Sequence, residues 1–435
     1  MDLYKIYLTH LIYLKALLIL INDNLYIGMV FAFIIVGYKL IISGGKKMQY
    51  NFDEIISRKH NFSAKYDEMD VKFGREDLIP MWIADMDFKT AEPIMEAMRE
   101  RLEQGIFGYV SRPASYFESV CEWFSKKHGW DVKTEYMSHG HGVVPGMVRM
   151  MNEFTQPGDK ILIQSPVYNE FFEIVEDHHR TLVISPLKLV NGRYEMDYED
   201  FEEKAKTGVK MFFLCNPHNP VGRVWTKEEL TRIGEICLRY GIQVIADEIH
   251  CELVYGDNKY IPFASISKEF FENSITCIAP SKTFNLAGLQ SSIIVFGKKM
   301  QKERYDYLLQ INDIKRNNCF SLVATEAAYR YGEEWLNQLL VYLKGNIDFV
   351  HEYCGKYIPK IKPNLPESTY LIWIDCKELG MSSEELKSFM TNQAKLGLGL
   401  WYGEESNDHV RMNIACPRSV VEQAMIRLKT AVDSL

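Results

Sequence analysis

The residues best suited to chemistry are a lysine and an aspartate, each found after an apolar run. Lys282 lies in the segment of residues 281–289, and Asp247 and Glu248 follow the apolar residues 244–246. A lysine amine can form a Schiff base with pyridoxal phosphate. A carboxylate elsewhere then keeps the pyridine nitrogen protonated, so that the ring accepts electrons from the substrate. The pair suggests this cofactor, although a lysine or aspartate taken alone is most often a solvated surface charge.

The composition is that of a large enzyme with a sizeable core. The chain has 435 residues, of which 47% are apolar and 25% charged, and this length predicts two domains. A net charge of −8 argues against a nucleic-acid partner, which requires a concentrated basic surface. The nine cysteines contain no Cys-x-x-Cys pair, which favours free thiols in the cytoplasm and neither disulfides nor a metal site.

Apolar runs of strand length alternate with amphipathic helical stretches. The expected strands are residues 160–164, 210–215, 242–246 and 275–279, and the expected helices include residues 227–240 and 324–331. This alternation predicts an α/β fold with a mostly parallel central sheet flanked by helices. Ligands of such sheets bind beyond the carboxyl ends of the strands, where the candidate site residues follow.

The last hundred residues predict a smaller α+β domain. After residue 335 come a further helix, strands around residues 368–375 and 410–414, and a closing helix at 419–435. We expect an N-terminal arm at residues 48–88 that joins this part of the chain. The expected large cofactor domain covers residues 89–334, and the C-terminal small domain covers residues 335–435.

Five motifs in order identify a family. They are the residues 81–88 (Met-Trp-Ile-Ala-Asp-Met-Asp-Phe), 216–222 (Asn-Pro-His-Asn-Pro-Val-Gly), 247–250 (Asp-Glu-Ile-His), 281–289 and 410–413. Between residues 48 and 435 the chain resembles the class I/II aminotransferase superfamily of fold type I. Within it, the chain resembles the MalY/PatB branch of cystathionine β-lyases, which are C–S lyases dependent on pyridoxal phosphate.

A phosphate site is expected in the glycine-rich turn of residues 140–146. Glycine allows close approach to the backbone, and a helix is expected from Met147 onward, so its N-terminus would favour an anion. The resemblance implies phosphate contacts from the backbone N–H groups of Gly142, Val143 and Val144 and from the hydroxyl of Ser281. It also implies that Tyr109 of the neighbouring subunit contacts the phosphate, and the protein is therefore expected to be a homodimer.

The resemblance assigns further roles in the site. Lys282 would be the Schiff-base lysine and general base, and Asp247 the partner of the pyridine nitrogen. Tyr168 would stack on the ring, Asn219 would bind the ring hydroxyl, and His250 would lie beside the cofactor. Substrate contacts are expected from Arg411, whose guanidinium offers two parallel donors to an α-carboxylate, and from Ile83 and Ala84. Many aminotransferases carry an arginine eight residues after the lysine, where this chain has Gln290.

Residues 1–47 differ in character from the rest. Their apolar runs, 8–21 and 27–42, are interrupted by His10, Lys15 and Lys39 and are short for a clean membrane span of about 20 residues. One interpretation is a tilted membrane anchor. The preferred one is an upstream extension that is not normally translated, because the stretch that begins at Met48 resembles the start of MalY-type proteins.

The resemblance favours β-elimination of L-cystathionine, or of a related cysteine S-conjugate, to a thiol, pyruvate and ammonia. Such a reaction belongs to methionine and cysteine metabolism. Two alternatives stay open on the sequence. An aminotransferase shares the first half of the reaction, and MalY-type proteins can also bind a transcriptional regulator, which would make the chain a partner-binding module that contains pyridoxal phosphate.

Overall fold

The computed structural model describes residues 49–435, of which residues 51–435 form one compact unit. The two interpretations of residues 1–47 concern a segment outside the described residues. Within residues 49–435, no helix combines the length and apolar character needed to cross a membrane. The boundaries expected after residues 88 and 334 stay predictions.

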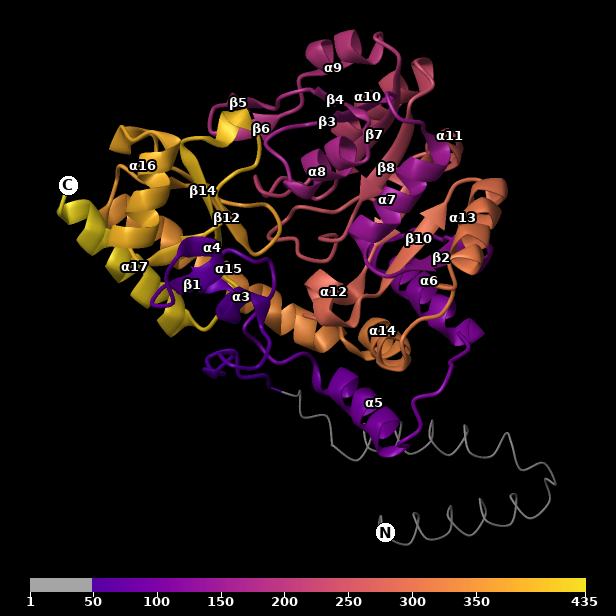
Figure 1. Cartoon of the computed structure of the whole chain (residues 1–435), viewed down its shortest axis with the longest axis horizontal. Coiled ribbons are helices and arrows are strands. Elements are labelled where there is room, and N and C mark those ends of the chain that lie inside the picture. The colour runs from indigo at the N-terminus through magenta and orange to yellow at the C-terminus, as the bar shows by residue number, and fades with distance from the viewer. Residues whose placement is uncertain (1–48) are drawn as a thin grey trace, which may run out of the picture. The chain divides into compact units, whose positions relative to one another are not determined.

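A seven-stranded sheet forms the centre of the fold (Figure 1). Its strands, in spatial order, are β2 (Met137–Gly140), β10 (Ser292–Phe296), β9 (Ser274–Ile278), β8 (Gln243–Asp247), β7 (Val209–Cys215), β3 (Lys160–Ile163) and β4 (Thr181–Ile184). Only β10 runs antiparallel to its neighbours in this sheet. The predicted α/β class with a mostly parallel sheet is therefore confirmed, and the four expected strands lie within two residues of their predicted bounds.

Helices cover both faces of the large sheet. Successive side chains of a strand point to opposite faces, so each strand contributes to both layers of the core. One face carries Ile161 and Phe213 and packs against α7 (Val143–Phe154), α8 (Glu170–Asp177) and α13 (Lys299–Ile311). The other face carries Leu162, Phe212 and Val244, and it packs against α9 (Tyr198–Ala205) and α10 (Lys227–Arg239). The near-continuous apolar runs in the sequence reflect this two-sided burial.

Local signals fix the helix ends. Thr226 and Glu229 form a reciprocal capping box at the start of α10.

Two sequence predictions placed helix starts too late. Helix α7 begins at Val143 rather than Met147, because Pro145 falls in the first turn, where its missing N–H is not needed. Helix α14 (Cys319–Tyr331) begins five residues before Ala324, because the Asn318 side chain accepts the Ser321 N–H as an N-cap.

The C-terminal part contains a three-stranded antiparallel sheet, which lies to the left of the large sheet and of α12 (Pro280–Thr283) in the view of Figure 1. Its strands are β11 (Lys362–Pro363), β12 (Leu371–Asp375) and β14 (His409–Asn413). Three helices accompany it: α15 (Glu333–Tyr357), α16 (Ser383–Ser388) and α17 (Arg418–Asp433). Strand β1 (Ile79–Met81) pairs in parallel with β13 (Leu396–Leu398), which anchors the start of the motif at residues 81–88.

The remaining α-helices and strands lie mainly before the large sheet in the chain. They are α3 (Ala64–Asp67), α4 (Met69–Phe73), α5 (Glu92–Glu103), α6 (Ala114–His128), the hairpin of β5 (Lys188–Val190) and β6 (Arg193–Glu195), and α11 (Lys268–Glu272).

Candidate active site

The carboxyl ends of the parallel strands bring most of the predicted site residues to one edge of the large sheet. They are Gly142 after β2, Tyr168 after β3, Asn219 after β7, Asp247 at the end of β8 and Lys282 after β9. Arg411 reaches this edge from β14, where its Nη1 donates to Asn219 Oδ1 at 3.2 Å. Residues far apart in sequence thus form one site, as expected where parallel strands end together.

The Lys282 amine is held by a backbone carbonyl rather than by a carboxylate. Its Nζ donates to the Ala84 oxygen at 2.6 Å. Burial, followed by the nearby positive charge of Arg411, lowers the pKa of Lys282 to about 8, although the carboxylates of Asp85 and Asp247 oppose this shift. A substantial fraction of the amine is therefore neutral near pH 8, which a nucleophile or a general base requires.

Asp247 is a buried carboxylate that forms no ion pair with another residue of the described part of the chain. Its Oδ1 accepts the Ile249 N–H at 3.2 Å. Burial raises the pKa of Asp247 to about 6, and the Ile249 N–H and the charge of Lys282 only partly oppose this effect. A ligand that brought a protonated nitrogen to this carboxylate would stabilise its ionised form.

Arg411 is almost fully buried and directs its donors into the site. Its Nη2 donates to the Trp82 oxygen at 2.7 Å, and the guanidinium lies 4.8 Å from the centre of the Tyr402 ring. The Arg411 Nε is buried and has no hydrogen-bond partner among residues 49–435. A buried, unsatisfied donor on a guanidinium is costly unless an anionic ligand binds it, so this group is suited to a carboxylate.

A segment of residues 82–88, here named the crossing segment, is bound through its backbone by side chains of the site. Asn413 Nδ2 donates to the oxygens of Ile83 and Asp85, each at 2.6 Å. Asn285 Nδ2 donates to the oxygens of Met86 and Phe88, each at 2.9 Å. Of the expected substrate contacts, Ala84 binds Lys282 through its carbonyl, and Ile83 lies between Ala84 and Trp82, whose carbonyl binds Arg411.

The two acidic residues of the crossing segment are anchored by a partly buried arginine and a buried lysine. Arg58 binds both oxygens of Asp85, at 2.6 and 3.0 Å, and one oxygen of Asp87 at 2.7 Å. Lys65 is only 1% exposed, and its Nζ lies 3.0 Å from Asp87 Oδ2. Breaking such a buried pair leaves an uncompensated charge, so this cluster fixes the crossing segment strongly.

His250 and Tyr168 complete the buried part of the site. Burial, with the charges of Lys282 and Arg411, lowers the pKa of His250 to about 3, so the imidazole is neutral at physiological pH. Its Nδ1 has no hydrogen-bond partner in the described structure, and its ring packs edge-on against Tyr370. Burial raises the pKa of Tyr168, whose hydroxyl also senses the charges of Arg411 and Asp247. An aromatic ligand here would meet a neutral imidazole and a phenol.

The glycine-rich turn has the geometry of an anion site. Gly142 has φ of +125°, which glycine adopts without strain, and it leads directly into the twelve-residue helix α7. Val143 and Val144 are the first two residues of that helix, so their N–H groups have no partner within it. Ser281 is partly buried at the start of α12.

Tyr109 is the predicted residue that the fold of a single chain does not bring into the buried site. Its side chain is 96% exposed, and the Arg316 guanidinium lies 5.6 Å from its ring centre.

Sequence reasoning also left several site residues without a role. Four of them lie inside the five motifs of the family, so the motifs could have indicated these residues: Asn285, Asn413, Asp85 and Asp87. Tyr370, just before β12, lay outside every motif.

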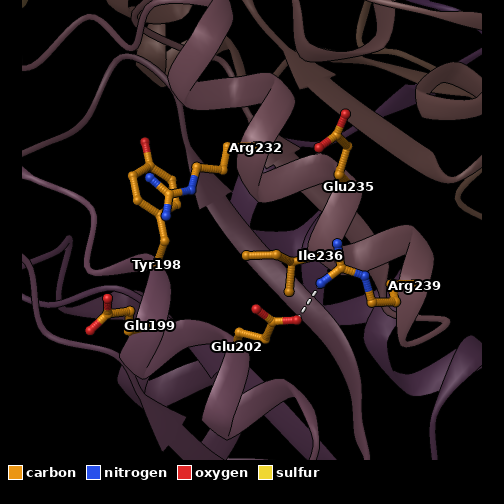
Figure 2. Close-up of a pocket in the computed structure, with 7 residues that line it drawn as sticks. All are labelled: Tyr198, Glu199, Glu202, Arg232, Glu235, Ile236 and Arg239. Atoms are coloured by element: carbon orange, nitrogen blue, oxygen red, sulfur yellow. Dashed lines mark hydrogen bonds and ion pairs between the residues drawn. The ribbon is translucent and has the colours of Figure 1, made fainter.

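A separate surface hollow of about 180 Å³ lies between α9 and α10 (Figure 2). Its lining is mostly charged, with the Arg232 guanidinium 4.0 Å from the centre of the Tyr198 ring and an ion pair between Glu202 and Arg239. Ligand sites are usually larger and mostly apolar, and this hollow contains none of the predicted site residues.

Comparisons with known proteins agree with this arrangement. Residues 76–428 match the family model of class I and II aminotransferases, and the chain belongs to this family. It is 40% identical, over 88% of its length and the whole of the relative, to the cystathionine β-lyase PatB of Bacillus subtilis, which confirms the resemblance to the PatB-type branch.

Two solved structures are also similar. One is a pyridoxal-phosphate-bound aminotransferase-like protein of Clostridium difficile, with a TM-score of 0.87, 50% identity and coverage of 88% of this chain and all of that one. The other is cystalysin of Treponema denticola, which contains pyridoxal 5'-phosphate, with a TM-score of 0.86, 31% identity and coverage of 89% of this chain and all of that one.

The pKa of Lys282 can be tested by competitive acetylation of the ligand-free protein across a pH series. We expect half-maximal reactivity of Lys282 near pH 8. Because the charge of Arg411 lowers this pKa, Arg411→Met should move the midpoint to higher pH. Arg418→Met is the control, since Arg418 Nε binds Asn346 instead. Equal midpoints in wild type and Arg411→Met would contradict the electrostatic coupling.

Asp247 should make the ligand-free protein less stable as the pH rises. Its folded-state pKa is raised from 3.8 to about 6, so stability is lost between these values, by about 3 kcal/mol at neutral pH. Asp247→Asn should therefore stabilise the ligand-free protein at pH 7.5 and make little difference at pH 4. Chemical denaturation at both pH values measures this difference, and a less stable variant at pH 7.5 would refute it.

Proposed function

We propose that the chain is a pyridoxal-phosphate-dependent C–S lyase. It cleaves L-cystathionine, or a related cysteine S-conjugate, to a thiol, pyruvate and ammonia. The observation that carries the proposal is the convergence of Lys282, Asp247 and Arg411 on one buried site. The chain also matches the whole of a cystathionine β-lyase with 88% of its own length. The absence of disulfides among the nine cysteines of the described residues supports a cytoplasmic location.

The donors and acceptors left without partners fit this cofactor. A buried carboxylate with a raised pKa suits a protonated ring nitrogen, and Asp247 provides it. The unpartnered N–H groups at the start of α7 suit a phosphate, to which Ser281 would add a hydroxyl. His250, Asn219 and Tyr168 would surround the ring. No arginine corresponds to the phosphate-binding one of many aminotransferases, so helix α7 would carry more of the phosphate contact.

When bound, pyridoxal phosphate supplies the electron sink for cleavage at the α-carbon. Arg411 would hold the substrate α-carboxylate with its planar donors, which orients the α-hydrogen toward Lys282. The neutral Lys282 amine would then take that proton at Nζ. Ile83 and Ala84 would border the substrate on the side of the crossing segment. Loss of the β-thiolate completes elimination, and water releases pyruvate and ammonia.

An aminotransferase reaction begins with the same proton transfer, and one solved structure similar to this chain is an aminotransferase-like protein. The match to PatB, which extends over the whole of that lyase, favours elimination. The two reactions differ in their need for a keto-acid acceptor, which makes them separable by experiment.

We further propose a homodimer in which Tyr109 reaches the phosphate site of the partner. Support comes from the exposure of this tyrosine and of the apolar side chains near it in sequence, Leu102, Ile106 and Phe107, each more than half exposed. Exposed apolar side chains clustered around a tyrosine are typical of a surface that a protein covers.

The purified protein should release pyruvate and homocysteine from L-cystathionine in equimolar amounts without an added keto acid. Lys282→Ala should lower the rate about 10³-fold or more, since the general base is lost. Coupled assays for pyruvate and free thiol measure both products. Turnover that requires a keto-acid acceptor would instead establish an aminotransferase.

Tyr109→Phe should raise the Kd for pyridoxal phosphate about tenfold, because a hydrogen bond to a charged group is lost. Absorbance titration measures this change. Mixed dimers of Tyr109→Phe and Lys282→Ala chains should contain one site with both residues intact and regain tight cofactor binding at that site. A protein that is monomeric by sedimentation, or mixed dimers without this gain, would exclude a shared site.

A further inference from the structure

The Ala84 carbonyl accepts two hydrogen bonds from side chains that the sequence places far apart. Lys282 Nζ donates at 2.6 Å, and the Tyr370 hydroxyl donates at 2.9 Å. A carbonyl oxygen has two lone pairs, so both bonds form at once. Tyr370 is completely buried, and its ring lies against His250. The tyrosine therefore shares an acceptor with the amine on which the proposed reaction depends.

We propose that Tyr370 is a positioning residue, which fixes the Ala84 carbonyl as the acceptor that orients the Lys282 amine during proton transfer at the α-carbon. This inference rests on the proposed function of Lys282 as the general base. Tyr370 itself neither gains nor loses a proton in the reaction. Burial raises the pKa of its hydroxyl well above the usual value, which keeps the hydroxyl a donor.

The carbonyl can orient the amine because its own position is determined from several sides. Asn413 binds the oxygens of the residues before and after Ala84, namely Ile83 and Asp85. The backbone carbonyl oxygen of Tyr370 accepts the Ile414 N–H at 3.0 Å, which anchors the tyrosine beside the strand that carries Asn413. Tyr370 and Asn413 thus form a rigid support for the carbonyl.

This support addresses a geometric need of the lysine. A free lysine amine ends a flexible four-carbon chain and has no preferred direction. One N–H bond to Ala84 restricts its rotation and lets the nitrogen lone pair point toward the substrate. After Nζ accepts the α-proton, the same N–H bond becomes charge-assisted and therefore stronger. The carbonyl stabilises the protonated lysine without the large pKa increase that a paired carboxylate would cause.

Tyr370→Phe tests this role, and the chain offers a matched control. Tyr255 is also buried, and its hydroxyl donates to the Thr369 oxygen at 2.7 Å, one residue before Tyr370. Tyr255→Phe therefore removes the same kind of buried hydrogen bond from a neighbouring position without touching Ala84. Both variants should lose comparable stability, which chemical denaturation measures.

The first measurement is exchange of the α-proton of L-alanine in D2O, followed by NMR with the cofactor-loaded protein. L-alanine has no leaving group, so this exchange reports on the lysine whether or not the protein is a lyase. We expect Tyr370→Phe to slow exchange at saturation about tenfold, with little change in KM, and to increase the α-deuterium isotope effect. Tyr255→Phe should remain within about twofold of wild type.

The second measurement uses the cofactor-free protein and needs no activity. Hydrogen–deuterium exchange of the crossing segment, residues 82–88, should be faster in Tyr370→Phe than in Tyr255→Phe. Equal effects of the two variants in either measurement would overturn the positioning role. If the wild-type protein exchanges the α-proton of L-alanine but does not cleave cystathionine, the proposed lyase activity fails while the role of Tyr370 stands on its own test.

Discussion

The site depends on a lysine amine buried beside an arginine and bound to an uncharged carbonyl. Burial and Arg411 both favour the neutral amine, and Ala84 supplies a hydrogen-bond acceptor without a negative charge. An ion pair in this place would hold the ammonium form and remove the base. The crossing segment meets this requirement because its carbonyls accept hydrogen bonds from side chains of three different parts of the fold.

Lys282 can bind an uncharged acceptor because the carboxylates of the crossing segment are paired with other cations. Asp85 and Asp87 are paired with Arg58 and Lys65, so their carboxylates do not pair with the amine. Two cations and two carboxylates form a compact cluster whose net charge is zero. The cluster combines two effects, since it anchors the segment and limits the influence of its acids on the pKa of Lys282.

Several groups of the site have too few partners among the described residues to offset their burial. The Asp247 carboxylate is buried, and within residues 49–435 neither the Arg411 Nε nor the His250 Nδ1 has a hydrogen-bond partner. Each of these groups would gain an interaction from a ligand that carries a protonated ring nitrogen, polar ring substituents and a carboxylate. Such unsatisfied groups are common at functional sites, where the surrounding fold offsets their cost.

The sequence alone determined the class of fold, four of the seven strands of the large sheet and the chemistry of the two leading residues. Two-sided burial of the strands of a parallel sheet produces apolar runs such as residues 210–215, and the residues at their ends are recognisable as motifs. The sequence placed the starts of α7 and α14 too late, because the cap of a helix depends on local hydrogen bonds as well as on apolar spacing.

Only the tertiary structure decided which groups meet. Lys282, Tyr370 and Ala84 are brought together by three separate elements, and no spacing in the sequence encodes the bond from Tyr370 to a backbone oxygen. Backbone acceptors carry no residue signature, so the partners of Asn285 and Asn413 were equally hidden. The contacts of the exposed Tyr109 were hidden for a related reason, since a side chain that reaches a neighbouring subunit depends on that subunit for its partners. Local patterns fix elements and side-chain chemistry, whereas the pKa of Lys282 depends on charges and burial supplied by the whole fold.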